Sequence, residues 1–226
     1  MRIVSFNVQH GRGADAGVHT SALARYCAGL AADVLGLQEV DVGARRSGSV
    51  DQAALVAQAT GMTHVFGRAS RVGARGAYGN ALLVRGRVTD VDVISLPRIA
   101  RHEPRAAVLA RAELADGELS VAVTHLSVDP VESRRQLDAV LGALAARPLP
   151  RVLLGDLNLT ADDVSGVIAG AGLSLTDTTE RTFPAVAPRA RIDHIAVVGL
   201  EILSVEVSAP APVSDHLALV VQLGVA

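Results

Sequence analysis

Val152-Leu153-Leu154-Gly155-Asp156-Leu157-Asn158 is a short apolar run that ends in a carboxylate and a carboxamide. Apolar runs of this length, bounded by polar or turn residues, predict strands. Five further motifs follow or end comparable runs, so polar side chains stand at the ends of several predicted strands. These motifs are Ser5-Phe6-Asn7, Leu37-Gln38-Glu39, Thr124-His125-Leu126, Arg191-Ile192-Asp193-His194 and Ser214-Asp215-His216.

The chemistry of these strand ends indicates a metal-assisted reaction on phosphate. Carboxylates, carboxamides and imidazoles at strand ends are expected to converge on one edge of a sheet. There a hard divalent cation can be held by oxygen ligands and can stabilise developing negative charge. The motifs therefore favour a phosphoesterase.

Strand-like and helix-like segments alternate irregularly, which predicts an α/β fold with a mixed sheet. Asp129-Pro130 supplies a cap and a helix-starting proline for the third helix. Helical periodicity predicts helices at Ser21–Ala32, Gln52–Gly61, Val131–Ala146 and Asp162–Gly170. Strands are predicted at Ile3–Val8, Val34–Gln38, Ala81–Val84, Val91–Leu96, Ala106–Ala110, Leu119–Leu126, Val152–Leu154, Ile192–Val198, Ile202–Val207 and Leu217–Leu223. The Gly- and Arg-rich segment 68–79 is expected to be a loop at the rim of the site.

The length and composition favour one domain that spans residues 1–226. Half of the residues are apolar, which supplies a sizeable core, but no window approaches the ~20 uninterrupted apolar residues of a membrane span. The first predicted strand begins at once after Met1, which leaves no room for a signal peptide, and the lone Cys27 has no disulfide partner. We therefore expect a cytoplasmic monomer.

The charge pattern disfavours long nucleic acid as the substrate. The net charge is −2, and all 21 basic residues are Arg. Proteins that act on long nucleic acids usually present a basic face, because neutralising backbone phosphates releases counterions. With five aromatic residues in the chain, a base-stacking platform is also hard to build.

From Asn7 to His216, the six motifs and their order resemble the endonuclease/exonuclease/phosphatase superfamily, the DNase-I-like metal-dependent phosphoesterases. Each motif alone is a common short sequence, but the series in this order is specific. The resemblance implies a four-layer α/β sandwich in which two packed, mixed β-sheets are flanked by helices. It also implies a phosphodiester substrate and a divalent metal cofactor, Mg²⁺ or Mn²⁺.

The metal is expected at the ends of the first two strands. Glu39 is the predicted ligand, and Asn7 either orients Glu39 or shares the cation. Mg²⁺ keeps several waters and needs few protein oxygens, which suits one carboxylate and one carboxamide. The resemblance adds Asp215 as a carboxylate on the metal side.

Attack by water is assigned to the second half of the chain. An imidazole is a suitable general base, and a carboxylate on its other nitrogen fixes the tautomer; the resemblance makes Asp193 this partner of His216. It also implies that Asp156 positions or activates the water and that Asn158 contacts the phosphoryl group. Asp156 and Asn158 are expected to point the same way along an extended segment. His194 should face the opposite side of its strand and be structural.

The remaining predicted residues bind phosphate or line the pocket. By resemblance, His125 contacts the scissile phosphate or protonates the leaving oxygen, and Arg105 matches an arginine that contacts phosphate. The nuclease branch pairs this histidine with a carboxylate where this chain has Asn80, so Asn80 is the expected partner of His125. Tyr78 is a candidate for lining the pocket.

Three functions remain open on the sequence. The favoured one is a phosphodiesterase for a small-molecule or lipid-headgroup diester. The second is a DNA or RNA nuclease whose Arg68, Arg71, Arg75, Arg98, Arg101 and Arg105 form a local basic strip. The third, a binding module without catalysis, is disfavoured because such a module has no physical need for uncompensated buried carboxylates.

Overall fold

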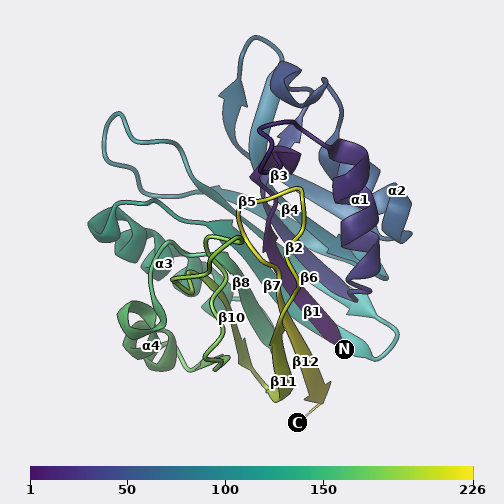
Figure 1. Ribbon diagram of the computed structural model, residues 1–226. Helices are drawn as coiled ribbons and strands as arrows, with labels where there is room; N and C mark the ends of the chain where they lie inside the picture. Colours follow the sequence, from purple (N-terminus) through teal and green to yellow (C-terminus); the bar gives the residue numbers. More distant parts are fainter. Residues whose placement is uncertain (226) are drawn as a thin grey trace.

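Two six-stranded sheets form the centre of the protein, in a computed structural model that describes residues 1–225 (Figure 1). The first sheet has the order β11-β12-β1-β2-β4-β3 and the second has the order β5-β6-β7-β8-β10-β9. The first contains β1 (Arg2–Asn7), β2 (Val34–Val42), β3 (Thr63–Val72), β4 (Gly76–Val84), β11 (Leu200–Val207) and β12 (Leu219–Val225). The second contains β5 (Arg87–Ser95), β6 (Ala106–Leu114), β7 (Gly117–His125), β8 (Arg151–Asp156), β9 (Ser174–Leu175) and β10 (Asp193–Val198).

The inner faces of the two sheets pack on each other through a core of aliphatic side chains. Successive side chains of a strand point to opposite faces, so every second residue of a central strand enters this layer. Ile3 and Val34 from the first sheet belong to the same buried cluster as Val123 and Leu154 from the second. At Gly36 the sheets approach so closely that a Cβ would lie 2.4 Å from Leu154 Cδ1. A side chain at position 36 would therefore press the two sheets apart.

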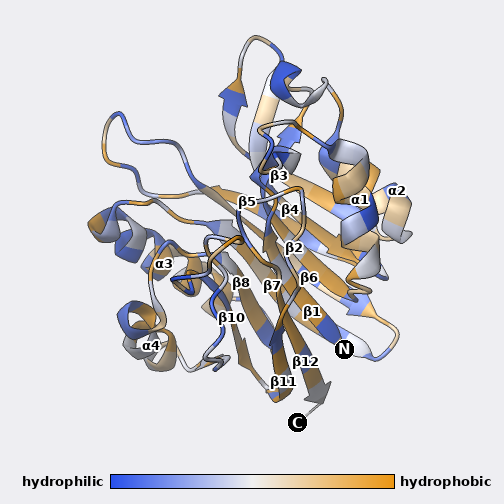
Figure 2. Cartoon of the chain, viewed as in Figure 1, coloured by the Kyte–Doolittle hydropathy of each residue, from blue (hydrophilic) through white to orange (hydrophobic). Residues whose placement is uncertain are grey.

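Helices cover the outer faces and complete the four layers. α1 (Thr20–Gly29) and α2 (Gln52–Thr60) cover the first sheet, whereas α3 (Pro130–Ala145) and α4 (Ala161–Gly170) cover the second. Figure 2 shows the apolar residues concentrated on the central strands. Asp129 caps α3 by accepting hydrogen bonds from the backbone N–H groups of Val131 and Glu132, with Pro130 in the first turn, as expected. The predicted four-layer sandwich of two mixed sheets is confirmed.

The topology brings four polar strand ends to one edge of the sandwich. β1 and β2 run parallel, with Asn7 opposite Gln38, and β7 and β8 run parallel, with His125 opposite Asp156. β10 runs antiparallel to β8, so its first residue, Asp193, lies opposite Asp156. Parallel strands end at the same edge of a sheet, and an antiparallel neighbour begins there. Strand direction therefore brings the polar residues of each sheet to one edge of that sheet, and the packing of the two sheets brings the two edges together.

Segment 68–79 differs from its predicted loop. Residues 68–72 end β3, Gly76 begins β4, and only Gly73–Arg75 form the turn of this hairpin. β3 was missed because it is an edge strand whose residues are largely exposed or half-buried, so it lacks an apolar run. Within residues 1–225, none of the helices has the length and apolar character needed to span a membrane.

Two short 3-10 helices lie on the same side as the polar strand ends. They are η1 (Gln9–Gly11), directly after β1, and η2 (Arg45–Ser47), directly after β2. Both follow strands that carry predicted site residues, so they form part of the rim around the site.

Candidate active site

A pocket of about 470 Å³ opens where the polar strand ends of the two sheets meet. Its walls contain eight residues predicted from the sequence to bind metal or substrate, to act on it or to line the pocket. These are Glu39, Tyr78, Arg105, His125, Asp156, Asn158 and Asp215, together with His216. Arg46, Glu103, Val128, Phe183 and Ile192, to which the sequence assigned no role, also line it. One pocket thus gathers residues from both ends of the chain.

Glu39 reaches the pocket through a β-bulge. The register between β2 and β4 shifts between Leu37 and Val40, and Glu39 has a φ of 59°, in the left-handed region. A non-glycine residue in this region is uncommon and is held there by its surroundings. The bulge turns the carboxylate away from the strand's regular alternation, which is a recurrent device next to active sites.

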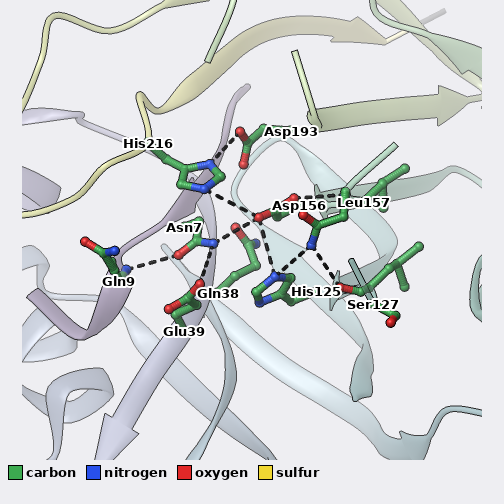
Figure 3. Close-up of polar contacts among 12 residues, drawn as sticks. Asn7, Gln9, Gln38, Glu39, His125, Ser127, Asp156, Leu157, Asp193 and His216 are labelled. Carbon is green, nitrogen blue, oxygen red and sulfur yellow. Dashed lines mark hydrogen bonds and ion pairs between the residues drawn. The ribbon is translucent and has the colours of Figure 1, made fainter. Parts of the chain in front are cut away.

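Asn7 links the two sheets across the pocket floor. Its Nδ2 donates to Glu39 Oε1 at 3.1 Å and to Asp156 Oδ2 at 3.0 Å, while its Oδ1 accepts from the backbone N–H of Gln9 at 3.0 Å (Figure 3). Both ends of the amide are therefore in use. This geometry orients Glu39 and Asp156, and it favours the orienting one of the two roles predicted for Asn7.

Two half-buried carboxylates face the pocket from the first sheet and its loops. Asp215 accepts a hydrogen bond from Gln9 Nε2 at 2.9 Å. Burial raises the pKa of the Glu39 carboxyl, against the hydrogen bond from Asn7, and the negative charge of Asp215 raises it further. A cation between the two groups would remove this repulsion. The donor set, carboxylate oxygens with room for water, fits a hard divalent ion.

Asp193, His216 and Asp156 form a buried line of acid, imidazole and acid. His216 Nδ1 lies 2.9 Å from Asp193 Oδ2, and His216 Nε2 lies 3.6 Å from Asp156 Oδ2 (Figure 3). The ring of Phe183 packs on the imidazole with centroids 4.7 Å apart. Two carboxylates on one ring favour its protonated form, and the hydrogen bond from Nδ1 fixes the ring's orientation.

The charges in this line shift the pKa values of its members. Burial opposes a charged His216, but Asp193 and Asp156 outweigh burial and raise the pKa of His216 to about 10. Burial and the nearby charge of Asp193 raise the pKa of Asp156 to about 7, although His216 opposes this rise. The two carboxylates therefore favour the protonated imidazole, and the Asp156 carboxyl is held above its ordinary pKa within the same line.

His125 is neutral and carries its proton on the side that faces the pocket. Arg105 Nη1 lies 3.0 Å from His125 Nδ1, and since a guanidinium only donates, this nitrogen accepts. Burial, then the charge of Arg105, holds the pKa of His125 well below its usual range. The proton is therefore on Nε2, which lies 3.5 Å from Asp156 Oδ2 and 3.1 Å from Asn158 Nδ2. The Nε2–H thus lies toward the Asp156 carboxylate, beside the Asn158 amide, whose Nδ2 donates to the Leu126 carbonyl at 3.0 Å.

Asn80 makes no side-chain hydrogen bond to His125 among the described residues. Its Nδ2 donates to the carbonyl oxygen of Ala106 at 2.8 Å, and among residues 1–225 the side chain on His125 Nδ1 is Arg105. The expected pairing of Asn80 with His125 is thus absent. Through this hydrogen bond, Asn80 links β4 to Ala106, the first residue of β6, which directly follows Arg105.

Asp156 and Asn158 are brought together by a turn and not by an extended segment. The backbone N–H of Asn158 donates to Asp156 Oδ1 at 3.0 Å, and Asn158 has a φ of 51°. This is an Asx-type turn, which asparagine tolerates well. At Gly155 a Cβ would lie 2.0 Å from the Thr124 carbonyl oxygen. The glycine permits close packing of β8 on β7.

Other predicted positions are placed as follows. Tyr78 is buried in the pocket wall, and the Arg46 guanidinium lies 5.4 Å from its ring centroid. His194 is buried on the opposite face of β10 from Asp193, where its Nε2 donates to the carbonyl of Leu159 at 2.8 Å. Arg46 was missed because it lies in a polar segment without a strand-end motif. Nothing in the sequence distinguishes Arg46, which lines the pocket, from the adjacent Arg45, which does not.

Asp156, Asp193 and His216 are also a second arrangement that could hold a cation, because their ligand atoms lie within 4.8 Å of one another. His216 Nδ1, however, is engaged by Asp193, and Mg²⁺ binds carboxylates and water in preference to imidazole. Glu39 and Asp215 offer only oxygen donors. By donor type, the Glu39 side suits a hard metal ion better, whereas the spacing of ligand atoms is that of a metal site at Asp156, Asp193 and His216.

Comparison with solved structures finds the same fold in several proteins of low sequence identity. An endonuclease/exonuclease/phosphatase from Beutenbergia cavernae is 22% identical, with a TM-score of 0.83 over 100% of this chain and 71% of that chain. The mannosyl-6-phosphatase of Bacteroides thetaiotaomicron is 18% identical, with a TM-score of 0.74 over 99% of each chain. The catalytic domain of human Nocturnin with bound sulfate is 18% identical, with a TM-score of 0.71 over 100% of this chain and 94% of that chain.

Sequence comparison supplies the family. Among curated protein sequences, none matches this chain significantly. The sequence model of the family matches residues 4–216, a range that begins in β1 and ends at His216, and so includes every residue of the pocket. This chain therefore belongs to the endonuclease/exonuclease/phosphatase family.

Proposed function

We propose that this protein is a divalent-metal-dependent phosphoesterase that hydrolyses a small phosphodiester, of the small-molecule or lipid-headgroup type. The observation that carries the proposal is the Asp193–His216–Asp156 line, which is buried and opens onto a pocket that also holds phosphate-binding donors. The family consists of hydrolytic phosphoesterases, which supports this class of reaction.

We assign the metal site to Glu39 and Asp215, with Asn7 as the residue that orients Glu39. A divalent cation, Mg²⁺ or Mn²⁺, would supply charge stabilisation at the phosphoryl oxygens. The left-handed backbone of Glu39 and its hydrogen bond from Asn7 hold this carboxylate toward the pocket before any ligand arrives. Such preorganisation lowers the cost of ordering the site.

The proton of the attacking water is assigned to Asp156. The sequence alone favours His216 as the base; the charges of Asp193 and Asp156 raise the pKa of His216 to about 10, which favours Asp156 for this role. Asp156 is within 3.6 Å of that imidazole, so a proton taken from water stays in the same line of groups. The imidazolium also stabilises the negative charge that develops on the phosphoryl group.

The phosphoryl group itself is assigned to Arg105, His125 and Asn158. Arg105 is buried, and its Nη1 lies 3.0 Å from His125 Nδ1 and 3.1 Å from Glu103 Oε2. The Nε2–H of neutral His125 and the amide of Asn158 then donate to phosphate oxygens. Since His125 is neutral, we assign it phosphate binding and not protonation of the leaving oxygen.

A small substrate is favoured by the size of the pocket and the charge of the chain. The pocket of about 470 Å³ suits a compact molecule, and the net charge is −2. One structural neighbour is a mannosyl-6-phosphatase, whose name denotes a phosphorylated sugar substrate.

A nuclease is the second candidate, because exposed arginines stand on both sides of the pocket. Arg68, Arg71 and Arg75 lie on the β3–β4 hairpin, and Arg98 and Arg101 lie in the segment before β6. Arg105 does not belong to this strip, since it is buried inside the pocket. Cleavage that weakens steeply with salt would support this reading.

The test compares two substrates under the same conditions, at low salt with Mg²⁺ or Mn²⁺. Supercoiled plasmid reports nuclease activity, and bis(4-nitrophenyl) phosphate reports turnover of a small diester. We expect hydrolysis of the small diester that is lost in Asp156→Asn, without nicking. Nicking that is lost in the same variant would replace this reading by the nuclease, and no metal-dependent turnover of either substrate would refute both.

A further inference from the structure

A second cleft, of about 670 Å³, lies beside the candidate active site. One wall is the segment around η2, which contains Gly43 to Ser49, and the other is the turn of the β3–β4 hairpin, Val72 to Gly76. Arg46 lines both this cleft and the active-site pocket. The two hollows are therefore neighbours that share a guanidinium.

Arg46 is held in place from beneath. Its Nε and Nη2 each donate to the buried carboxylate of Asp41 at 2.8 Å, and Ser47 Oγ donates to the same carboxylate at 2.9 Å. The guanidinium also packs over the Tyr78 ring. Nη1 is left for another acceptor, so the residue is an oriented donor and not a freely moving surface arginine.

The cleft carries more positive than negative charge. Arg45 and Arg75 line it and are exposed, and among the described residues neither has a carboxylate within salt-bridge distance. The one acidic group engaged here, Asp41, is buried and bonded to Arg46. Three guanidinium groups against one carboxylate attract an anion, and guanidinium pairs suit phosphate oxygens.

The walls of this cleft are fixed by close backbone packing. A Cβ on Gly76 would lie 2.8 Å from Ala44 Cα, so the hairpin rests directly on the segment that carries Arg45 and Arg46. The segment itself is closed by hydrogen bonds from Gly43 N–H to the Val50 carbonyl at 2.8 Å and from Ser49 N–H to the Ala44 carbonyl at 2.8 Å. The arginines therefore project from a rigid frame.

We propose that this cleft binds a second phosphate group of the substrate, a phosphate monoester on the same small molecule as the scissile phosphate. The inference rests on the proposed function for the location of the scissile phosphate and extends it to the substrate class. A monoester carries about two negative charges near neutral pH, which matches the surplus of guanidinium groups better than a diester with one charge. The preferred substrates are thus doubly phosphorylated.

The test measures binding, so that its outcome does not depend on turnover. Alkane-α,ω-bisphosphonates of increasing chain length, whose C–P bonds resist hydrolysis, are titrated calorimetrically with Mg²⁺ against the alkyl monophosphonate of the same length. We expect one chain length to bind at least about tenfold more tightly than its monophosphonate, a difference equivalent to about 1.4 kcal/mol. A methyl ester on the second phosphonate should remove most of this advantage.

Arg45→Gln with Arg75→Gln should reduce the bisphosphonate advantage to less than about twofold, because the second anion loses its partners. The matched control is Arg87→Gln with Arg134→Gln, which removes the same charge from exposed positions on β5 and α3. This control should keep the advantage. The proposal is overturned if no bisphosphonate is preferred by the wild type, or if the preference survives in the Arg45/Arg75 variant.

The failure of the proposed function can be distinguished from the failure of this inference. If bis(4-nitrophenyl) phosphate shows no metal-dependent turnover, the phosphoesterase assignment is refuted regardless of the calorimetric result. Turnover of that diester without any bisphosphonate preference would keep the phosphoesterase and remove the second phosphate site. A preference lost instead in Arg98→Gln with Arg101→Gln would place the second anion on the other side of the pocket and would also overturn the proposal.

Discussion

The two walls of the pocket hold their charged groups in different ways. The wall built on the first sheet presents Glu39 and, from the loop before β12, Asp215, both half-buried and open to the pocket. The wall built on the second sheet presents Asp156 and Asp193, both buried and joined through His216. Open carboxylates suit a hydrated cation, whereas buried ones around an imidazole suit proton transfer.

Two hydrogen bonds between side chains of the site connect these walls. Asn7 of the first sheet donates to Asp156 of the second, and His216, just before β12 of the first sheet, is bonded to Asp193 of the second. The relative position of the sheets therefore sets the distance between the cation side and the proton side. Because the cation side and the proton side lie on different sheets, the geometry of the site depends on how the sheets pack as well as on the site residues themselves.

Loss of the group at the junction of both walls should have the largest effect. Asp156→Asn keeps the shape but removes the proton acceptor and one acceptor of the Asn7 amide, so we expect kcat to fall by about 10³-fold. Steady-state kinetics on bis(4-nitrophenyl) phosphate measure this effect. Asp162→Asn, on exposed α4, is the matched control and should remain near wild type. A loss below about tenfold would remove Asp156 from the reaction.

His194 contrasts with the histidines of the pocket, because it lies on the other face of β10. Burial lowers the pKa of His194 from 6.5 to about 4, so the folded protein keeps it neutral. Above pH 6.5 His194 is neutral in both the folded and the unfolded chain, so it does not lower the free energy of unfolding. As the pH falls toward 4, the unfolded chain takes up a proton that the folded protein does not, and the free energy of unfolding decreases by roughly 3 kcal/mol.

His194→Gln removes this titration and retains a donor for the Leu159 carbonyl. Urea unfolding across the same pH range should therefore show a flatter decline of the free energy of unfolding in the variant. Parallel declines in the two proteins would show that another group dominates the acid sensitivity.

Removal of the open carboxylate should affect metal binding and leave the buried line in place. Glu39→Gln is expected to raise the Mg²⁺ concentration for half-maximal activity by at least about tenfold, while turnover at saturating metal falls less. A metal titration of activity provides the measurement, with Glu201→Gln on β11 as the matched control. An unchanged titration midpoint would assign the cation elsewhere, with Asp156, Asp193 and His216 as the next set to test.

The sequence pattern predicted an α/β fold with a mixed sheet, and the family resemblance of the motifs supplied the two-sheet sandwich and most of the residues that line the pocket. An apolar run followed by Asp, Glu, Asn or His marks where a strand stops. The direction of each strand then determines at which edge of its sheet that residue lies. The β3 strand escaped prediction because an exposed edge strand needs no apolar run. The sequence also could not show that Arg105, and not Asn80, occupies His125 Nδ1, since this depends on side-chain packing between strands.

Local backbone conformation was equally hidden. Nothing in Leu37-Gln38-Glu39 distinguishes a regular strand end from a bulge with left-handed Glu39, because the bulge is imposed by pairing with β4. Arg46 was invisible for a related reason, since its importance comes from Asp41, whose burial depends on the folded chain. Patterns along the chain predict which groups arrive at the site, and contacts across the chain decide what they do there.

The contact between the walls can also be disturbed at a distance from the pocket. Gly36→Ala places a Cβ against Leu154 where the sheets are closest, and we expect it to cost about 1–3 kcal/mol in the free energy of unfolding. Gly142→Ala is the control, because a Cβ there meets nothing within 4 Å on exposed α3, and it should stabilise the helix by up to about 1 kcal/mol. If sheet spacing sets the site, Gly36→Ala must lower kcat in the folded protein as well as its stability. A destabilised variant with wild-type kcat would show that the Asn7–Asp156 and His216–Asp193 bonds hold the walls in register without help from the core.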